Sequence, residues 1–153
     1  MAKVKLKKIR LPPEAVAAAD RLHSAAIHLL RRLRQQDIAS GVGPAQLSAL
    51  SVLVFSGPKT LGQLAAAEQI KPPTMSRAVA GLKSSQLIEV TRDSCDARLM
   101  HIRATSKGTN LLQEARQRRI EYLATHLCSL TKLELAGLGS AADILESLVR
   151  KWQ

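Results

Sequence analysis

The sequence contains few aromatic residues. One phenylalanine, one tyrosine and one tryptophan make up only 2% of its 153 residues, although hydrophobic residues account for 46%. A core must therefore be built from leucine, alanine, valine and isoleucine, a mixture that suits packed helices better than a β-sandwich. The length suits one domain, or one small unit with a helical extension.

Residues that carry catalytic or metal chemistry are also sparse. Cys95 and Cys128 lie far apart, with no CxxC pairing and no histidine at ligand spacing, which argues against a zinc site or a disulfide framework. No Ser/His/Asp set, glycine-rich phosphate loop or paired carboxylate pattern is present in the linear sequence. We therefore expect no enzyme activity, no cofactor and no metal.

Acidic residues do not balance the basic ones. There are 12 Asp and Glu against 23 Lys and Arg, a formal net charge of +11. Such a charge attracts polyanions, and neutralised phosphates release counterions, so nucleic acid is the default partner. Residues 1–12 form a basic, flexible arm in this interpretation, and its role as a solvated tail, a DNA-gripping arm or a membrane-surface patch stays open.

Long apolar runs are missing as well. No run approaches the roughly 18 residues needed to span a bilayer. The basic start lacks the apolar stretch and the small-residue cleavage site of a secretory signal. We expect a cytoplasmic protein that does not enter a membrane.

Apolar residues recur at spacings of three and four in both flanking parts of the chain, which predicts amphipathic helices over residues 13–40 and 106–153. Pro13 suits the first turn of the first helix. Thr131 and Glu134 form a capping box that starts the last one.

The central part, residues 44–105, has the pattern of a helix-turn-helix followed by a hairpin. Thr60 and Gln63 form a capping box at the start of the first short helix. Lys71 breaks the run, and the prolines that follow open a second helix. That helix should turn Met75, Val79 and Leu82 inward and leave the following residues on or near its outer face: Lys71, Pro73, Thr74, Ser76, Arg77 and Lys83.

After this helix the apolar period changes from 3.6 to 2. Residues 87–91 and 99–104 are two β-prone runs joined by a polar linker, which predicts a β-hairpin. A hairpin directly after a helix-turn-helix is a wing. Arg92, Ser94 and Arg98 on this wing are candidates for contact with DNA, where an arginine can reach a narrow minor groove.

In order and spacing, the stretch from Leu47 through Gly108 resembles the MarR family of winged-helix transcriptional regulators. The motifs that carry the resemblance are Leu61-Gly62-Gln63-Leu64-Ala65, Pro73-Thr74-Met75-Ser76-Arg77, Leu87-Ile88-Glu89-Val90, Asp96-Ala97-Arg98 and Thr105-Ser106-Lys107-Gly108. The resemblance implies a mainly α fold with a small β-hairpin wing, an α+β winged helix-turn-helix of about six helices. The first helix and the last two would form a dimerisation domain.

The same resemblance implies a homodimer that places two recognition helices on double-stranded DNA, at a pseudo-palindromic operator. Asp96 would support the wing rather than contact DNA, and its alternative interpretation is a simple turn-former. Gln86 stands where the family usually has glycine. If that position needs a positive φ, the local turn carries strain of about 1 kcal/mol.

Many members of the family are released from DNA by small anionic aromatic molecules. By that resemblance His23, His28 and Arg31 are candidate lining residues of an effector pocket. Cys95 at the wing is a candidate redox sensor, because neighbouring arginines favour its thiolate. The main prediction is a homodimeric repressor, and the alternatives are a non-specific nucleic-acid-binding or nucleoid-type protein and a redox-sensing repressor.

Overall fold

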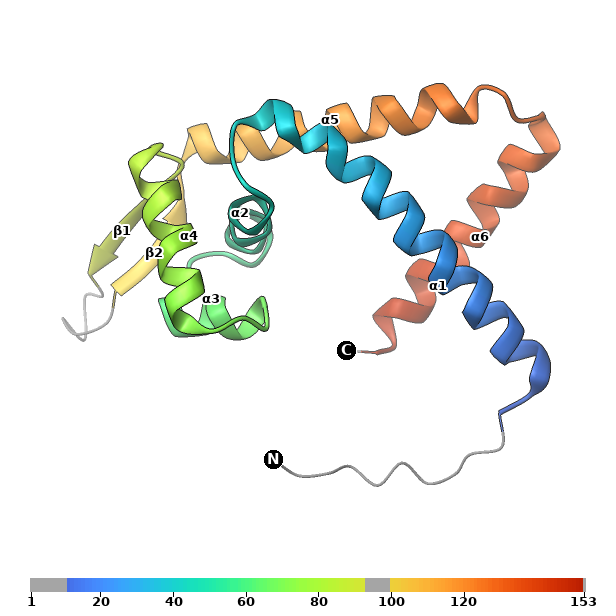
Figure 1. Cartoon of the computed structure of the whole chain (residues 1–153), viewed down its shortest axis with the longest axis horizontal. Helices are drawn as coiled ribbons and strands as arrows, with labels where there is room; N and C mark the ends of the chain where they lie inside the picture. Colours follow the sequence, from blue (N-terminus) through green and yellow to red (C-terminus); the bar gives the residue numbers. More distant parts are fainter. Residues whose placement is uncertain (1–10, 93–99, 153) are drawn as a thin grey trace.

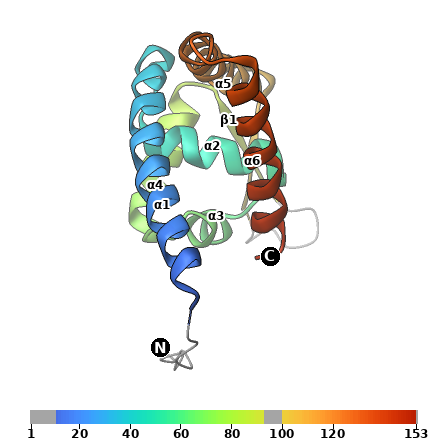
Figure 2. The same ribbon diagram turned by 90° about the vertical axis from the view of Figure 1, so that its right-hand side faces the viewer.

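The computed structural model describes residues 11–92 and 100–152 (Figures 1 and 2). Within them, six α-helices, one 3-10 helix and a two-stranded antiparallel sheet follow one another. In chain order the elements are α1 (Pro13–Arg34), η1 (Gln35–Ser40), α2 (Pro44–Ser56), α3 (Leu61–Ala67), α4 (Pro72–Ser84), β1 (Ile88–Arg92), β2 (Met100–Ala104), α5 (Ser106–Leu127) and α6 (Lys132–Arg150). The predicted winged helix-turn-helix fold is confirmed.

The core lies in one lobe, built from α2, α3, α4, both strands and the first half of α5. Its largest fully buried side chains are Leu50, Leu64, Met75, Leu82 and Leu87. Leucine and alanine supply most of this core. The prediction of a core without aromatic residues is therefore confirmed.

Local signals set the ends of the two helices of the helix-turn-helix. Thr60 accepts a hydrogen bond from the N–H of Gln63, whose side chain accepts one from the N–H of Thr60, so the predicted capping box is present. Gln69 and Gln86 follow the ends of α3 and α4 with φ of 53° and 60°. Each helix thus closes through a left-handed residue that is normally glycine. The positive φ considered for Gln86 is confirmed.

The wing strands pair in register, with Ile88 opposite Ala104 and Arg92 opposite Met100. Strand β1 is shifted by one residue from the predicted run 87–91. Strand β2 agrees with the predicted run 99–104 over residues 100–104, and Leu99 lies outside the described residues. Glu89 and Arg103 face each other across the strands and form an ion pair. Lys59, before α3, also pairs with Ile102 through two backbone hydrogen bonds of 3.1 and 2.8 Å. The wing is therefore joined through β2 to the residue that precedes the helix-turn-helix.

Helices α1 and α6 extend away from this lobe. Figure 2 shows them on opposite sides of the molecule, with α5 leading from the lobe toward α6. Neither α1 nor α6 contains a buried residue. The predicted capping box at the start of α6 is present, and the hydrogen bonds from the backbone and side chain of Thr131 lower the pKa of Glu134.

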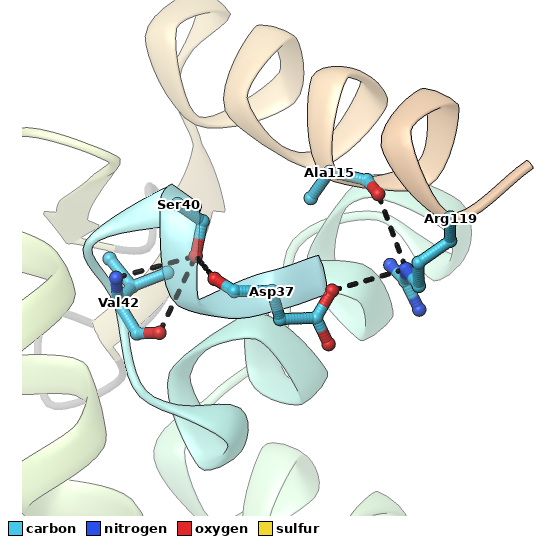
Figure 3. A network of polar contacts seen from close by, with 5 residues as sticks. All are labelled: Asp37, Ser40, Val42, Ala115 and Arg119. Atoms are coloured by element: carbon cyan, nitrogen blue, oxygen red, sulfur yellow. Dashed lines mark hydrogen bonds and ion pairs between the residues drawn. The ribbon is translucent and has the colours of Figure 1, made fainter. Parts of the chain in front are cut away.

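An ion pair joins the end of α1 to α5. Asp37 in η1 is buried, with 8% of its surface exposed, and its Oδ1 lies 3.2 Å from Nε of Arg119 (Figure 3). The Nε–H group of Arg119 donates its hydrogen bond to the carbonyl of Ala115 at 3.3 Å, so the contact with Asp37 is electrostatic. Ser40 closes η1 by donating to the carbonyl of Asp37 at 2.5 Å.

No single helix of the described chain is long and apolar enough to cross a membrane. The segment 13–40 and α2 together have the length and apolar composition of a membrane span, but the chain is bent by 90° between them.

Candidate nucleic-acid interface

Helix α4 presents a polar face to the surface and an apolar face to the core. Met75 and Leu82 are completely buried, as predicted, whereas Val79 is half-buried and Ala78 is buried. The predicted surface residues are all exposed: Lys71, Pro73, Thr74, Ser76, Arg77 and Lys83. The first two turns of α4 therefore carry exposed hydroxyl and guanidinium groups.

Close packing against α2 sets the depth of this helix. The side chain of Gln46 accepts a hydrogen bond from the N–H of Gly43 at 2.7 Å and lies over Gly81 of α4. A Cβ atom at position 81 would overlap the Gln46 amide, so glycine leaves room for this amide in its present position over α4. No local pattern in the sequence predicts this pair, because the two residues are 35 positions apart.

The wing contributes one described candidate. Arg92 is exposed at the end of β1. The other wing candidates lie outside the described residues: Ser94, Cys95, Asp96 and Arg98. Residues 1–10 of the basic arm also lie outside them. Their assigned roles remain predictions.

A hollow of about 430 Å³ lies where α1 and η1 meet α2 and α5. Its walls include Leu33, Arg34, Asp37, Leu112 and Arg119. The predicted effector residues His23, His28 and Arg31 are exposed on α1 and are not among the residues that line it in one protomer. Their role in effector binding remains untested.

Metal chemistry has no counterpart in the part of the chain that the structure describes. No three His, Cys, Asp or Glu side chains gather there in a way that could hold a metal ion. What the lobe offers is an exposed helix for a partner to contact.

The lobe corresponds to a known sequence family. A sequence model of the MarR family matches residues 40–99, which run from the end of η1 into the wing. An uncharacterized HTH-type transcriptional regulator of Mycobacterium bovis is 36% identical over 139 residues, covering 91% of this chain and 96% of that protein.

Two solved structures share the whole arrangement of helices. A MarR family protein from Bacillus stearothermophilus has a TM-score of 0.76 and 23% identity, covering 92% of this chain and 99% of that one. A mutant of MepR from S. aureus, bound to an oligodeoxyribonucleotide, has a TM-score of 0.66 and 21% identity, covering 86% and 97%. With this fold, the exposed α4 and the relative that matches over nearly its full length, the chain is a member of the MarR family of helix-turn-helix transcriptional regulators, a class of proteins that are not enzymes.

Proposed function

We propose that the protein is a sequence-specific, homodimeric repressor that binds a pseudo-palindromic operator through α4 of each protomer. The observation that carries this proposal is the polarity of α4: its first turns place Thr74, Ser76 and Arg77 at the surface while Met75 anchors it in the core. An α-helix fits the major groove, where arginine can bind guanine with two hydrogen bonds and hydroxyls can bind bases or phosphates.

The remaining contacts follow from position and charge. Lys71 and Pro73 lie at the start of α4, Lys83 lies near its end, and Arg92 lies on the wing. Lysines that neutralise phosphates would supply affinity, whereas Arg77 would supply base preference. Ser94 and Arg98 are proposed to extend the wing contact. The MepR mutant, which shares the fold, is bound to an oligodeoxyribonucleotide, and this supports DNA as the partner.

Dimerisation is proposed from the exposed apolar residues of α1 and α6. These helices bury nothing within one protomer, yet they expose large hydrophobic side chains: Val16, Leu22, Ile27, Leu29 and Leu30 on α1, and Leu133, Leu135, Leu138, Ile144, Leu148 and Val149 on α6. Apolar surface of this extent marks a protein interface. A second copy of the chain would cover it and hold the two α4 helices about one turn of DNA apart, roughly 34 Å.

Release from DNA is proposed to follow a change in that spacing. The hollow at the junction of α1, η1, α2 and α5 is lined by apolar residues with two arginines, Arg34 and Arg119, and two acidic residues, Asp37 and Glu68. Arg119 is paired with Asp37, so Arg34 is proposed to bind the anionic group of a small aromatic effector. An effector that binds better to a protomer arrangement unlike the operator-bound one would lower repressor occupancy. As a regulator of DNA, the protein is proposed to act in the cytoplasm.

Two alternative functions can be tested by the same experiment. A net charge of +11 favours binding to any duplex, so a nucleoid-type protein would also bind. Oxidation of Cys95 would act on the wing instead of on the hollow.

The proposal is tested with the purified full chain and a fragment library of its genome, followed by gel shifts of a selected fragment against random duplex. We expect a bound operator that resists competition by random DNA. Arg77→Ala should weaken operator binding by about 1 to 3 kcal/mol and relax its base preference. The control is Arg150→Ala, which removes an exposed arginine paired with Glu146 on α6 and should leave base preference unchanged.

The outcomes separate the candidates. If the affinities for operator and for random DNA fall equally as the salt concentration rises, the result would favour the nucleoid-type protein. Equal weakening of every sequence by Arg77→Ala would assign that residue to a phosphate. If peroxide abolishes operator binding by the wild type but not by Cys95→Ser, the result would favour the redox mechanism.

A further inference from the structure

The end of α4 is held by the start of α5. Within α4, the last turn closes when Gln86 and Leu87 donate their N–H groups to the carbonyls of Lys83 and Leu82, each at 2.9 Å. The next three carbonyls are those of Ser85, Gln86 and Leu87, in the turn that follows α4. They are bound in succession by Lys107 in the first turn of α5 and by Thr105 at its N-cap.

Each of these three hydrogen bonds has an ordinary length. The Lys107 ammonium donates to the carbonyl of Ser85 at 3.0 Å, and the Thr105 hydroxyl donates to that of Gln86 at 2.9 Å. The N–H group of Thr105 donates to the carbonyl of Leu87 at 3.0 Å. Two residues of one helix start therefore cap the carboxyl end of another helix.

Gly108 makes the contact possible. A Cβ atom at this position would overlap the carbonyl oxygen of Leu87 and would lie 3.1 Å from Cδ1 of Leu50. The N–H group of Gly108 donates to the Thr105 hydroxyl at 3.1 Å, so that hydroxyl is both donor and acceptor. The approach of the two backbones is thus fixed by hydrogen bonds and by close packing.

Lys107 is the one charged member of this contact. The carboxyl end of a helix carries a partial negative charge that a cation stabilises. Its ammonium group is directed at the Ser85 carbonyl, although the side chain is exposed and a basic residue near a wing would ordinarily be assigned to a phosphate. In this geometry the ammonium group binds a carbonyl of the protein's own backbone.

We propose that Lys107 is a positioning residue, which orients the recognition helix relative to α5 and does not contact DNA. Because α5 continues from this contact toward α6, the orientation at the α4 end is transmitted to the spacing of the two recognition helices in the dimer. Lys107 therefore contributes to discrimination between operators of different half-site spacing. This inference rests on the proposed function.

The test compares Lys107→Met with Lys83→Met in the full chain. Both variants remove one positive charge near the end of α4, and the side chain of Lys83, unlike that of Lys107, makes no hydrogen bond or ion pair within the described part of the chain. Operator binding is measured across a salt series and against operators with one base pair added or removed between the half-sites. Thermal unfolding reports whether each variant is folded at the assay temperature.

Lys107→Met is expected to weaken binding to the best operator about tenfold, because each protomer loses one hydrogen bond to a carbonyl that is left without it. The salt slope should stay at the wild-type value, and discrimination between spacings should fall at least about threefold. Lys107→Arg should restore both, since it retains a charged donor. A general loss of stability would not change spacing discrimination.

Two results would overturn the positioning role. A salt slope reduced by about 1.8 in Lys107→Met would show one phosphate contact per protomer. Unchanged spacing discrimination in that variant would show that the contact does not orient α4. Failure of the wild type to bind any operator would instead count against the proposed function.

Discussion

The lobe and the two helices that extend from it differ in how they use apolar residues. In the lobe, α2 buries Leu47, Ala49, Leu50 and Leu53 within one protomer. In α1 and α6 no residue is buried, and Leu133 and Ile144 of α6 are 83% and 68% exposed. Both regions are rich in apolar side chains, so they differ in whether those side chains are buried within the described chain. The lobe has its own core, whereas α1 and α6 bury none of their residues within the described chain, and the proposed dimer would cover them.

Helix α5 belongs to both regions. Its first half supplies Gly108, Leu112 and Ala115 to the buried core of the lobe, and no residue of its second half is buried. Two contacts tie it to other elements: the capping of α4 at its start, and the pair of Arg119 with Asp37 further along. A change in the position of α5 would therefore reach both α4 and η1, while η1 also leads directly into α2, which packs against α4.

The largest effect is expected from a charge placed on α6. Leu148→Glu should raise the dimer dissociation constant by at least about two orders of magnitude, because two carboxylates would be buried in an apolar interface at a cost of about 3 kcal/mol or more. Sedimentation velocity over a concentration series measures the dissociation constant.

The matched control adds the same charge to the lobe. Ala66→Glu on α3 changes an exposed position and should leave the oligomeric state as it is. Leu148→Glu should also lower the melting temperature in a concentration-dependent way, since the partner's surface stabilises α1 and α6. A dimer that tolerates Leu148→Glu would remove the contrast between the two regions.

The second prediction concerns the lobe. Gly108→Ala should destabilise the protein by about 2 to 3 kcal/mol, because the new methyl group meets the backbone of Leu87, which cannot move without shifting the end of α4. Urea unfolding measures the loss. Gly137→Ala on α6 is the control, since a Cβ atom there meets nothing within 4 Å and alanine favours the helix. Equal effects of the two changes would contradict the close packing at position 108.

The third prediction concerns the junction of the two regions. A double-mutant cycle of Asp37→Ala and Arg119→Ala should give a coupling free energy of about 1 kcal/mol, below that of a fully buried pair because 34% of the Arg119 side chain is exposed. The reference is the cycle of Glu146 and Arg150, whose side chains are 70% and 76% exposed, with about 0.3 kcal/mol expected. Both are measured by urea unfolding. A junction coupling no larger than the reference would mean that the pair does not hold η1 to α5.

Short-range patterns were predictable from the sequence. The capping boxes of Thr60 with Gln63 and Thr131 with Glu134 are confirmed, because a box is complete within four residues. The exposed face of α4 was also predictable, since the helical period alone turns Met75 and Leu82 inward. The same period also turns Val79 toward the core, against which it packs while only partly buried.

Contacts between distant residues were not predictable in this way. The pairing of Lys59 with Ile102 and that of Asp37 with Arg119 join segments more than 40 positions apart. Lys107 illustrates the limit at the candidate site. In the sequence it is a basic residue near a wing, and only the folded chain shows that its ammonium group reaches the Ser85 carbonyl.

The smallest effect is expected at the left-handed residue that ends α4. Gln86→Gly should raise the free energy of unfolding by about 0.5 to 1 kcal/mol, since glycine relieves the cost of a positive φ while losing some entropy in the unfolded chain. Gln69→Gly, at the equivalent position after α3, should give a similar gain when both are measured by urea unfolding. Neither change touches α1 or α6, so the dimer dissociation constant should stay at the wild-type value. A decrease in stability at Gln86 alone would mean that its side chain contributes more to the α4 end than its backbone strain costs, and the lobe would then owe part of its stability to that residue.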